Sequence, residues 1–431
     1  MRTWILLVLL CAQQPLSAYS FQTHEQLIDL SWNSTIKPFI LSRYPHTTAE
    51  DLERAHAYAY GGCAIQDLGY YPSGNHFFSD LTHYVRTGEF IESLFRQARN
   101  SDELAFAIGA LSHYVGDAIG HRLAINPSVA IEFPKLEKRY GTTVNYAQNP
   151  HAHVQTEFAF DIDEISKRRM APAAYLRHVG LKVATGSLGR AFLETYGLHF
   201  ERVLGQRRPV VRGYRFAVRS FLPRIAYGEA LLHRKKFPPD DRTPAFEIFE
   251  RNLESADFKK YWEPYRRQTP TFLTRVVAAT IFIMPKFGPL ALLKIRGPIP
   301  ETHERYIDSV NASTTSLRKV LATKERYPYV PNLDLDTGEK VRPGGYPLTD
   351  ETYFKLLARV TKDPTSAVPI GLKQNILEYY ADPAAPISTK KVKKDWAQVE
   401  SQLAVLQGMK TSGVAREVRA EAPEQPTDND P

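Results

Sequence analysis

Five histidine and acidic residues in two short stretches have the types and the spacing of metal ligands. His113, Asp117 and His121 follow one another at intervals of four residues, and His153 and Glu157 repeat that interval further along the chain. At 3.6 residues per helical turn, positions i, i+4 and i+8 stay within about 80° of one another. Imidazole nitrogens and carboxylate oxygens are donors that zinc takes. The two stretches therefore predict zinc ligands on two helices.

A single pair of this kind has a simpler interpretation as a solvated or capping polar face of a helix. Two pairs, with a third histidine in register on the first helix, favour the metal site. The zinc-protease motif H-E-x-x-H is absent from the chain, so the predicted site is of another type.

The helix that must position the first stretch spans residues 101–121, SDELAFAIGALSHYVGDAIGH. Upstream, Thr23 and Gln26 have the spacing of a capping box, which predicts a helix that begins at His24. Further helices are expected at 48–62, 78–86, 89–99, 131–140, 179–205, 212–234, 244–266, 302–326, 350–361 and 391–410. No strand-type alternation of any length is present, and the fold class is predicted to be all-α.

An aromatic-rich loop between two of these helices carries further candidates, namely Asp67, His76, Asp80 and His83. A carboxylate and histidines on such a loop suit the open edge of a metal site that faces a cleft. The alternative is that the aromatic residues belong to the core and the polar residues cap turns. Nine of the 13 histidines lie between His24 and His153, which favours the metal site.

Two other stretches have features that bear on function. Residues 272–295 are the most apolar internal segment, but Arg275, Pro285 and Lys286 interrupt it, so a buried helical hairpin is expected, with a membrane-contacting patch as the alternative. Residues 332–345, NLDLDTGEKVRPGG, resemble a calcium loop; however, Gly338 falls at the seventh position instead of the sixth, which predicts a turn-rich loop.

The N-terminus predicts export. Arg2, an apolar run and small residues at Ser17 and Ala18 have the pattern of a secretory signal peptide over residues 1–18. Cleavage after Ala18 makes Tyr19 the mature N-terminus, and cleavage after Ser20 is the competing site. The chain is then periplasmic or extracellular, with one cysteine, Cys63, expected to be a small buried apolar residue.

Composition and net charge indicate the class of protein and the kind of partner. The 431 residues are 43% hydrophobic and 24% charged, as in an ordinary globular protein, and the net charge of +8 suits anionic partners. We expect a zinc-binding catalytic helical core at 19–165, a helical extension packed on it at 166–410 and a disordered tail at 411–431.

With these residues in place, the first 160 positions resemble the zinc-dependent phospholipases C of bacteria, which share an all-helical fold with the single-strand-specific nucleases of fungi. The resemblance implies a multi-helix phospholipase C/nuclease-like bundle that binds two to three zinc ions. The ligands it implies, in chain order, are Tyr19, His24, Asp67, either His83 or His76, His113, Asp117, His121, His153 and Glu157. Asp117 would bridge two ions, and Asp67 would bind zinc and act as the catalytic base.

The implied function is that of a secreted phosphodiester hydrolase of the phospholipase C type. Zinc-activated water would cleave a phospholipid to diacylglycerol and a phosphorylated head group. Glu157 favours the phospholipase branch, because the nuclease branch has aspartate there. The alternatives are a zinc-dependent nuclease or 3′-nucleotidase and a non-catalytic secreted zinc-binding protein. The expected partners are a phospholipid or other phosphodiester and a transient membrane-surface contact, with no stable nucleic-acid partner.

Overall fold

The computed structural model describes residues 20–233, 240–256, 258–266, 297–323 and 325–413. Within these ranges almost all regular structure is helical, and the four strands have two residues each. The predicted all-α fold class is therefore confirmed. The predicted signal peptide, Tyr19 and the apolar stretch 272–295 lie outside the described residues.

The first half of the chain contains the helices α2 (Phe21–Ser31), α3 (Lys37–Arg43), α4 (Ala49–Gly62), α5 (His76–Tyr84), α6 (Thr87–Gln97), α7 (Ser101–Gly120), α8 (Asn126–Glu132), α9 (Pro134–Tyr140), α10 (Pro150–Ser166), α11 (Ala173–Val179), α12 (Thr185–Tyr196) and α13 (Phe200–Leu204). The second half contains α14 (Arg207–Phe216), α15 (Leu222–His233), α16 (Pro244–Ser255), α17 (Phe258–Tyr261), α18 (Glu263–Arg266), α20 (Pro300–Leu321), α21 (Pro347–Val360), α22 (Ile370–Tyr379) and α23 (Lys393–Gly408).

The strands form two small pairs. β1 (Leu333–Asp334) and β2 (Glu339–Lys340) are antiparallel, with Leu333 opposite Lys340. β3 (Val368–Pro369) and β4 (Thr411–Ser412) are parallel. β4 lies at the start of the segment 411–431 that was predicted to be disordered, and residues 414–431 are outside the described part.

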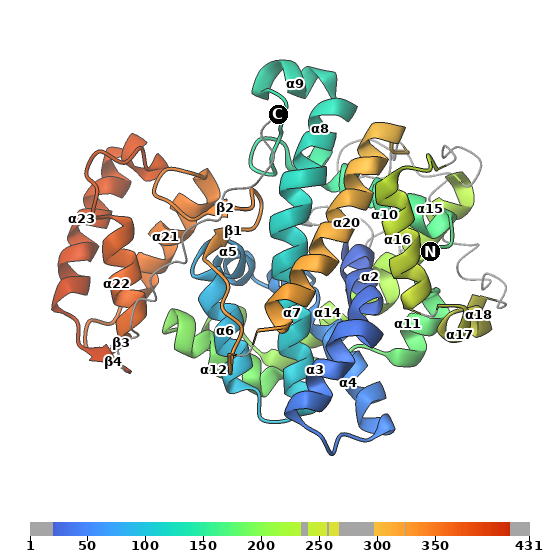
Figure 1. Ribbon diagram of the computed structural model, residues 1–431. Helices are drawn as coiled ribbons and strands as arrows, with labels where there is room; N and C mark the ends of the chain where they lie inside the picture. The colour runs from blue at the N-terminus through green and yellow to red at the C-terminus, as the bar shows by residue number, and fades with distance from the viewer. Residues whose placement is uncertain (1–19, 234–239, 257, 267–296, 324, 414–431) are drawn as a thin grey trace, which may run out of the picture.

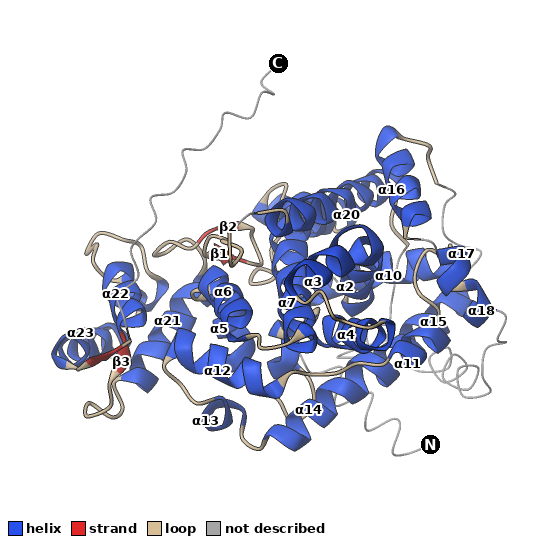
Figure 2. Cartoon of the chain, turned by 60° about the horizontal axis from the view of Figure 1, so that its bottom comes forward, coloured by secondary structure: helices blue, strands red, loops and turns tan. Residues whose placement is uncertain are grey.

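Helix α7 runs through the middle of the molecule in both views (Figure 1, Figure 2). Its N-terminus is fixed by Asn100, whose side-chain oxygen accepts a hydrogen bond from the Glu103 N–H at 2.9 Å. Leu104 to Ala118 are buried, as expected of a helix that is apolar on all sides. The predicted helix at 101–121 is confirmed to within one residue, and its central position makes it a rigid support for His113 and Asp117.

Two glycines allow α4 to pack directly on α7. A Cβ atom at Gly62 would lie 2.1 Å from the Phe106 carbonyl oxygen, and one at Gly109 would lie 2.2 Å from that of Ala59. Neither position has room for a side chain, because backbone atoms of the opposite helix fill the space. The close approach brings the Cys63 carbonyl, just beyond α4, to His113 on α7.

In the part of the chain that the structure describes, three helices contain a wider, π-helical turn, at Trp32–Ile36, His121–Ile125 and Ala217–Phe221. Each turn is followed two residues later by a proline, which is Pro38, Pro127 or Pro223. Proline lacks the N–H that would bond to the carbonyl four residues earlier, and its ring clashes with that carbonyl. The wider turn relieves this conflict. His121 therefore begins a π turn instead of ending the α-helix, yet it stays in register with His113 and Asp117.

The second half of the chain packs against the first. Helix α20 lies along α2 and α7 (Figure 1), and the Tyr306 hydroxyl is 2.9 Å from the Thr23 Oγ1. The predicted capping box of Thr23 and Gln26 is wrong. Helix α2 begins three residues earlier, at Phe21, and Thr23 donates its hydroxyl hydrogen to Asp161 at 2.7 Å. The Thr23 hydroxyl therefore binds a carboxylate distant in the sequence instead of capping its own helix.

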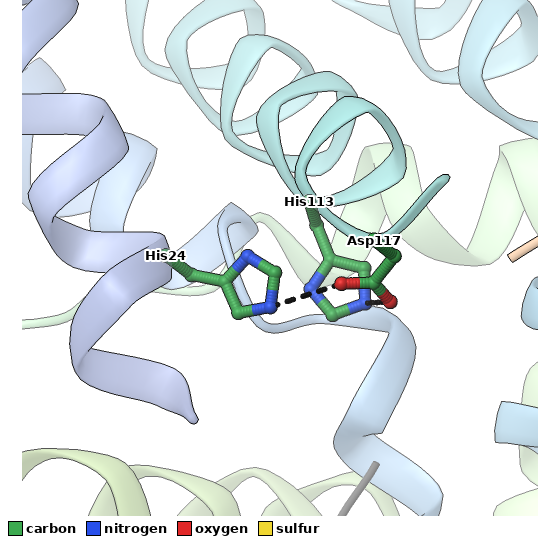
Figure 3. A group of neighbouring side chains, drawn as sticks. All are labelled: His24, His113 and Asp117. Carbon is green, nitrogen blue, oxygen red and sulfur yellow. Dashed lines mark ion pairs between the residues drawn. The ribbon is translucent and has the colours of Figure 1, made fainter. Parts of the chain in front are cut away.

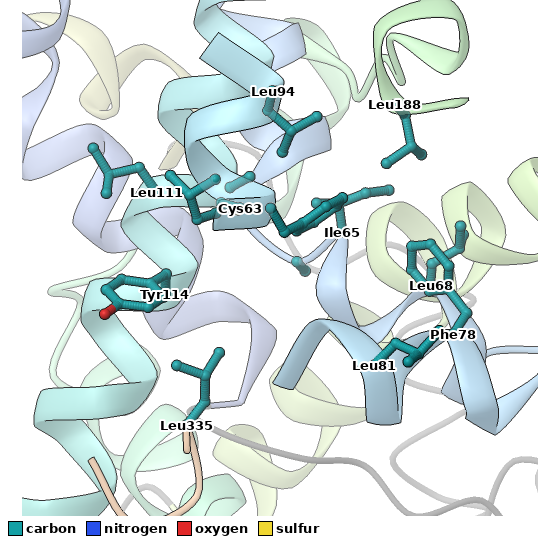
Figure 4. Close-up of a cluster of buried hydrophobic side chains, with 14 of the residues drawn as sticks. Cys63, Ile65, Leu68, Phe78, Leu81, Leu94, Leu111, Tyr114, Leu188 and Leu335 are labelled. Carbon is teal, nitrogen blue, oxygen red and sulfur yellow. The ribbon is translucent and has the colours of Figure 1, made fainter. Parts of the chain in front are cut away.

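The core is continuous across both halves. In Figure 4 the side chain of Leu335, from the second half, belongs to the same buried cluster as Leu111 and Tyr114 of α7. Cys63 is fully buried in the same cluster, as predicted. The predicted boundary at residue 165 falls in the last turn of α10.

In the described residues, no helix combines the length and the apolar character that crossing a membrane requires.

Candidate metal centre

The donor atoms predicted from the sequence converge in three neighbouring groups. They are His24 with His113 and Asp117; Asp67 with His83 and His113; and His121 with His153 and Glu157. Within each group the candidate donor atoms lie within 4.8 Å of one another, and every side chain is buried. The eight residues come from α2, the turn Gln66–Tyr70, α5, α7, the π turn at His121 and α10.

Asp117 lies between the first two groups. Its Oδ1 is 3.1 Å from the Nε2 of His24, and its Oδ2 is 3.0 Å from the Nε2 of His113 (Figure 3). The same Oδ2 is 3.5 Å from the Nε2 of His83. The two oxygens of one carboxylate thus face donors of different groups, which is the geometry of a bridging ligand.

The second group joins the loop to the helices. The Nε2 of His83 lies 3.4 Å from the Oδ1 of Asp67 and 3.4 Å from the Nε2 of His113. Burial alone would lower the pKa of His83, but Asp117 and Asp67 face the ring and raise its pKa well above the ordinary value, so the two carboxylates stabilise positive charge at this position. In a tetrahedral zinc site with bonds of about 2.0–2.1 Å, neighbouring donors are roughly 3.3 Å apart. The spacing fits that geometry.

The third group is set by α10 and the π turn. The Oε1 of Glu157 is 2.8 Å from the Nε2 of His153 and 3.5 Å from that of His121. Despite these distances, none of the three atoms has a hydrogen-bond partner among the described residues. The contacts are short, but their angles do not suit a hydrogen bond. Buried polar atoms are normally paired. Three such atoms within 4.8 Å of one another fit a metal ion.

Backbone carbonyls orient three of the histidines. The Nδ1 of His83 lies 2.8 Å from the Ser79 carbonyl oxygen, and that of His113 lies 3.0 Å from the Cys63 carbonyl oxygen. His121 makes the same contact with the Leu335 carbonyl at 2.6 Å. A carbonyl only accepts, so Nδ1 carries a hydrogen and Nε2 is the ring nitrogen left to bind a metal. This is the arrangement that surrounds metal-bound histidine.

The electrostatics of the site also suit a cation. Burial lowers the pKa of His153 well below its ordinary value, and His121 lowers it further, so the imidazole is neutral. Burial raises the pKa of Glu157 well above its ordinary value, and the charges of Asp117 and Asp67 add to this effect. Burial alone would also raise the pKa of Asp117, but His113 and His24 face it and hold the pKa well below its usual range.

The structure distinguishes His83 from His76, which the sequence left as alternative ligands. His83 lies inside the second group and is fully buried. His76, at the first position of α5, is exposed, and its ring contacts the edge of Tyr70 at 5.4 Å between centroids. The geometry therefore brings His83, and not His76, to the other candidate donors. Asp80 also lies outside these groups, 3.9 Å from the Lys355 ammonium.

A fourth acidic and histidine cluster, Asp163, Glu164 and His303, has a different character. The Arg169 Nε donates to Glu164 at 2.9 Å, and its Nη2 lies 3.1 Å from the Nε2 of His303. The Lys167 ammonium is 2.9 Å from Asp163. Side-chain cations already balance these carboxylates, so the cluster is an ion-pair network that ties α10 to α20.

Sequence reasoning missed the partners that hold the ligands in place. The carbonyls of Cys63, Ser79 and Leu335 carry no signature in the sequence, because every residue has one. Asp161, which accepts the Thr23 hydroxyl hydrogen and so fixes the first turn of α2, was also missed. Its position four residues after Glu157, on the same face of α10, was the available signal.

Comparison with known families agrees with this geometry. Residues 23–205 match the family model described as zinc-dependent phospholipase C. The resemblance inferred from the ligand order is thereby confirmed. No curated protein and no solved structure was found to match the chain. The matched segment contains every described candidate ligand from His24 to Glu157.

Proposed function

We propose that the protein is a zinc-dependent phosphodiester hydrolase of the phospholipase C type, which releases diacylglycerol and a phosphorylated head group. The observation that carries the proposal is the bridging position of Asp117 between two buried groups of donors. The family match supports the general kind of function. Glu157 favours phospholipid over nucleic acid, in line with the phospholipase branch of the resemblance.

Zinc held by such donors stabilises charge on a phosphoryl oxygen and lowers the pKa of bound water towards neutrality. The residues of this chain would then have three tasks. His24, His83, His113, Asp117, His121, His153 and Glu157 hold two to three ions. Asp67, on the turn Gln66–Tyr70, orients the attacking water and accepts its proton. Tyr19, as the mature N-terminal residue of an exported protein, is proposed as a further ligand.

The number of donors supports catalysis over a purely structural role for zinc. Structural zinc sites are closed by four protein ligands, whereas catalytic sites keep a position for water. Nine candidate ligands with one shared carboxylate would leave coordination positions for water and substrate. Burial of all eight described candidate ligands provides the low-dielectric surroundings in which such electrostatic stabilisation is strongest.

Parallel assays test the proposal. The purified protein, with zinc counted by elemental analysis, would be incubated with phosphatidylcholine vesicles and with single-stranded DNA. We expect two to three zinc ions per chain and the release of diacylglycerol. Release of nucleotides alone would assign the protein to the nuclease class instead. Zinc uptake without either activity would favour the non-catalytic alternative, and no zinc uptake after reconstitution would overturn the enzyme assignment.

A further inference from the structure

The hairpin of β1 and β2, residues 332–341, lies outside the segment that matches the family, yet it contacts the elements that carry the candidate ligands. The sequence predicted a turn-rich loop here. The structure shows a tight hairpin in which Asp334 and Asp336 are buried. These contacts with ligand-bearing elements are more than a loop that only connects two helices requires.

Leu335 joins two ligand-bearing elements through its main chain. Its N–H donates a hydrogen bond to the His83 carbonyl oxygen at 3.0 Å. Its carbonyl accepts one from the Nδ1 of His121 at 2.6 Å. This second bond sets the tautomer of His121 and directs its Nε2 towards Glu157. One residue of the hairpin therefore fixes the relative placement of α5 and the π turn.

Asp336 brings a buried carboxylate next to the same region. Its Oδ2 accepts hydrogen bonds from the Tyr84 hydroxyl at 2.8 Å and from the Tyr346 hydroxyl at 2.6 Å. Within the described residues its Oδ1 has no hydrogen-bond partner, and the side chain is fully buried. A buried carboxylate oxygen without a partner is unusual, and a position beside a bound cation would account for it.

Gly338 shows how closely the hairpin is fitted to α7. Its φ angle is +69°, and a Cβ atom there would lie 2.1 Å from the carbonyl oxygen of Ala118. Ala118 directly follows Asp117 in the last turn of α7. Glycine is required both by the left-handed backbone and by the absence of space, so the turn of the hairpin rests against the end of the helix that carries Asp117.

We propose that the hairpin 332–341 is a positioning element of the metal centre, in which Leu335 orients His121 and Asp336 supplies outer-sphere negative charge that increases zinc affinity. This inference rests on the metal centre proposed above. Its competitor is a hairpin that only attaches the second half of the chain to the first. Attachment alone would change stability and leave zinc affinity as it is.

The variant Asp336→Asn tests the charge while it keeps an oxygen acceptor for the two tyrosines. We expect a loss of zinc affinity of about 10- to 100-fold at one of the sites, as is usual for outer-sphere partners. Affinity would be measured by competition with a chromophoric chelator on the full chain, and site geometry by the visible spectrum of the cobalt-substituted protein. The spectrum is expected to change, which a purely structural role would not produce.

Asp334→Asn is the matched control in the same hairpin. Asp334 is also buried, but its carboxylate accepts hydrogen bonds from the Thr349 hydroxyl at 2.5 Å and from the Asp336 N–H at 3.1 Å. These partners lie in the hairpin and in α21, and none is a candidate ligand. Zinc affinity equal to that of the wild type is expected for this variant.

The outcomes separate the two proposals. A wild-type protein that binds zinc, with an Asp336→Asn variant of equal zinc affinity and an unchanged cobalt spectrum, overturns the role of the hairpin alone. A wild-type protein that binds no zinc overturns the metal centre and the hairpin role together. If Asp336→Asn does not fold, Asp336→Ser, which also removes the charge, decides by the same two measurements.

Discussion

The imidazole of His121 and the carbonyl of Leu335 are 214 positions apart in the chain, and their Nδ1 and oxygen atoms lie 2.6 Å apart. The hydrogen bond connects a candidate ligand inside the family segment with a residue far outside it. The candidate metal centre is therefore completed by both halves of the chain.

Replacement of Asp117 by asparagine is expected to remove the bridge between the first two groups. An amide presents a single oxygen acceptor and no negative charge, so it cannot bind on both sides as the carboxylate does. We expect zinc content to fall by at least one ion per chain and activity to fall by at least about 100-fold, beyond the range for outer-sphere partners. Elemental analysis and the vesicle assay measure these effects. Full zinc content together with full activity would contradict the bridging role.

The two histidines of α5 are expected to differ sharply in their effects. His83→Ala removes a donor that lies 3.4 Å from Asp67 and 3.5 Å from Asp117, so both zinc content and activity should fall. His76→Ala is the matched control, because it is the same substitution seven residues earlier on an exposed side chain. It should keep the zinc content and activity of the wild type. The opposite result would assign the ligand to His76.

Substitution of Gly109 by alanine is expected to force α4 away from α7. The added Cβ would lie 2.2 Å from the Ala59 carbonyl oxygen, which belongs to a helix backbone and cannot move aside alone. Overpacking of this kind destabilises a protein by about 1–3 kcal/mol. Urea unfolding of the wild type and the variant measures the change in free energy of unfolding.

The matched control for Gly109→Ala is Gly186→Ala in α12. The nearest atom to a Cβ there is the end of the flexible Arg190 side chain at 3.3 Å. Alanine favours the helix by up to about 1 kcal/mol over glycine, so this variant should be as stable as the wild type or more so. Equal destabilisation by both substitutions would show that the close packing of α4 on α7 is not the cause.

Loss of the Arg169 guanidinium should destabilise the protein in a pH-dependent way. Burial alone would raise the pKa of Glu164, but Arg169 and His303 lower it to about 2. The folded pKa thus lies below the ordinary value of 4.5, so the ion pair stabilises the fold above that pH and ceases to do so as the pH falls towards 2. Arg169→Gln leaves the buried carboxylate without its main partner, at a cost of about 3–5 kcal/mol near pH 7.

The pH profile and a double variant check this explanation. In Arg169→Gln the pKa of Glu164 should rise, because burial is no longer offset by the guanidinium, and the destabilisation should shrink as the pH falls through that raised pKa and the carboxyl takes a proton. The double variant Arg169→Gln with Glu164→Gln should recover part of the lost stability at pH 7. A penalty that is constant between pH 4 and pH 7 would contradict the charge-based explanation.

The sequence by itself determined the helical fold class, the central helix and the identity of the candidate donors. These features are local, because an interval of four residues places His113 and Asp117 on one helix face whatever the rest of the chain does. The polar cap at Asn100 and the apolar run after it likewise act within a few residues. Such information can be read directly from a chain.

Only the tertiary structure decided which donors meet and what holds them. His76 and His83 share one short helix, and the sequence could not choose between them, since the choice depends on which face of α5 packs towards α7. The capping box at Thr23 failed for the same reason, because a distant carboxylate, Asp161, took its hydroxyl hydrogen. Backbone carbonyls such as that of Leu335 are present in every residue, and folding alone selects the one that orients His121.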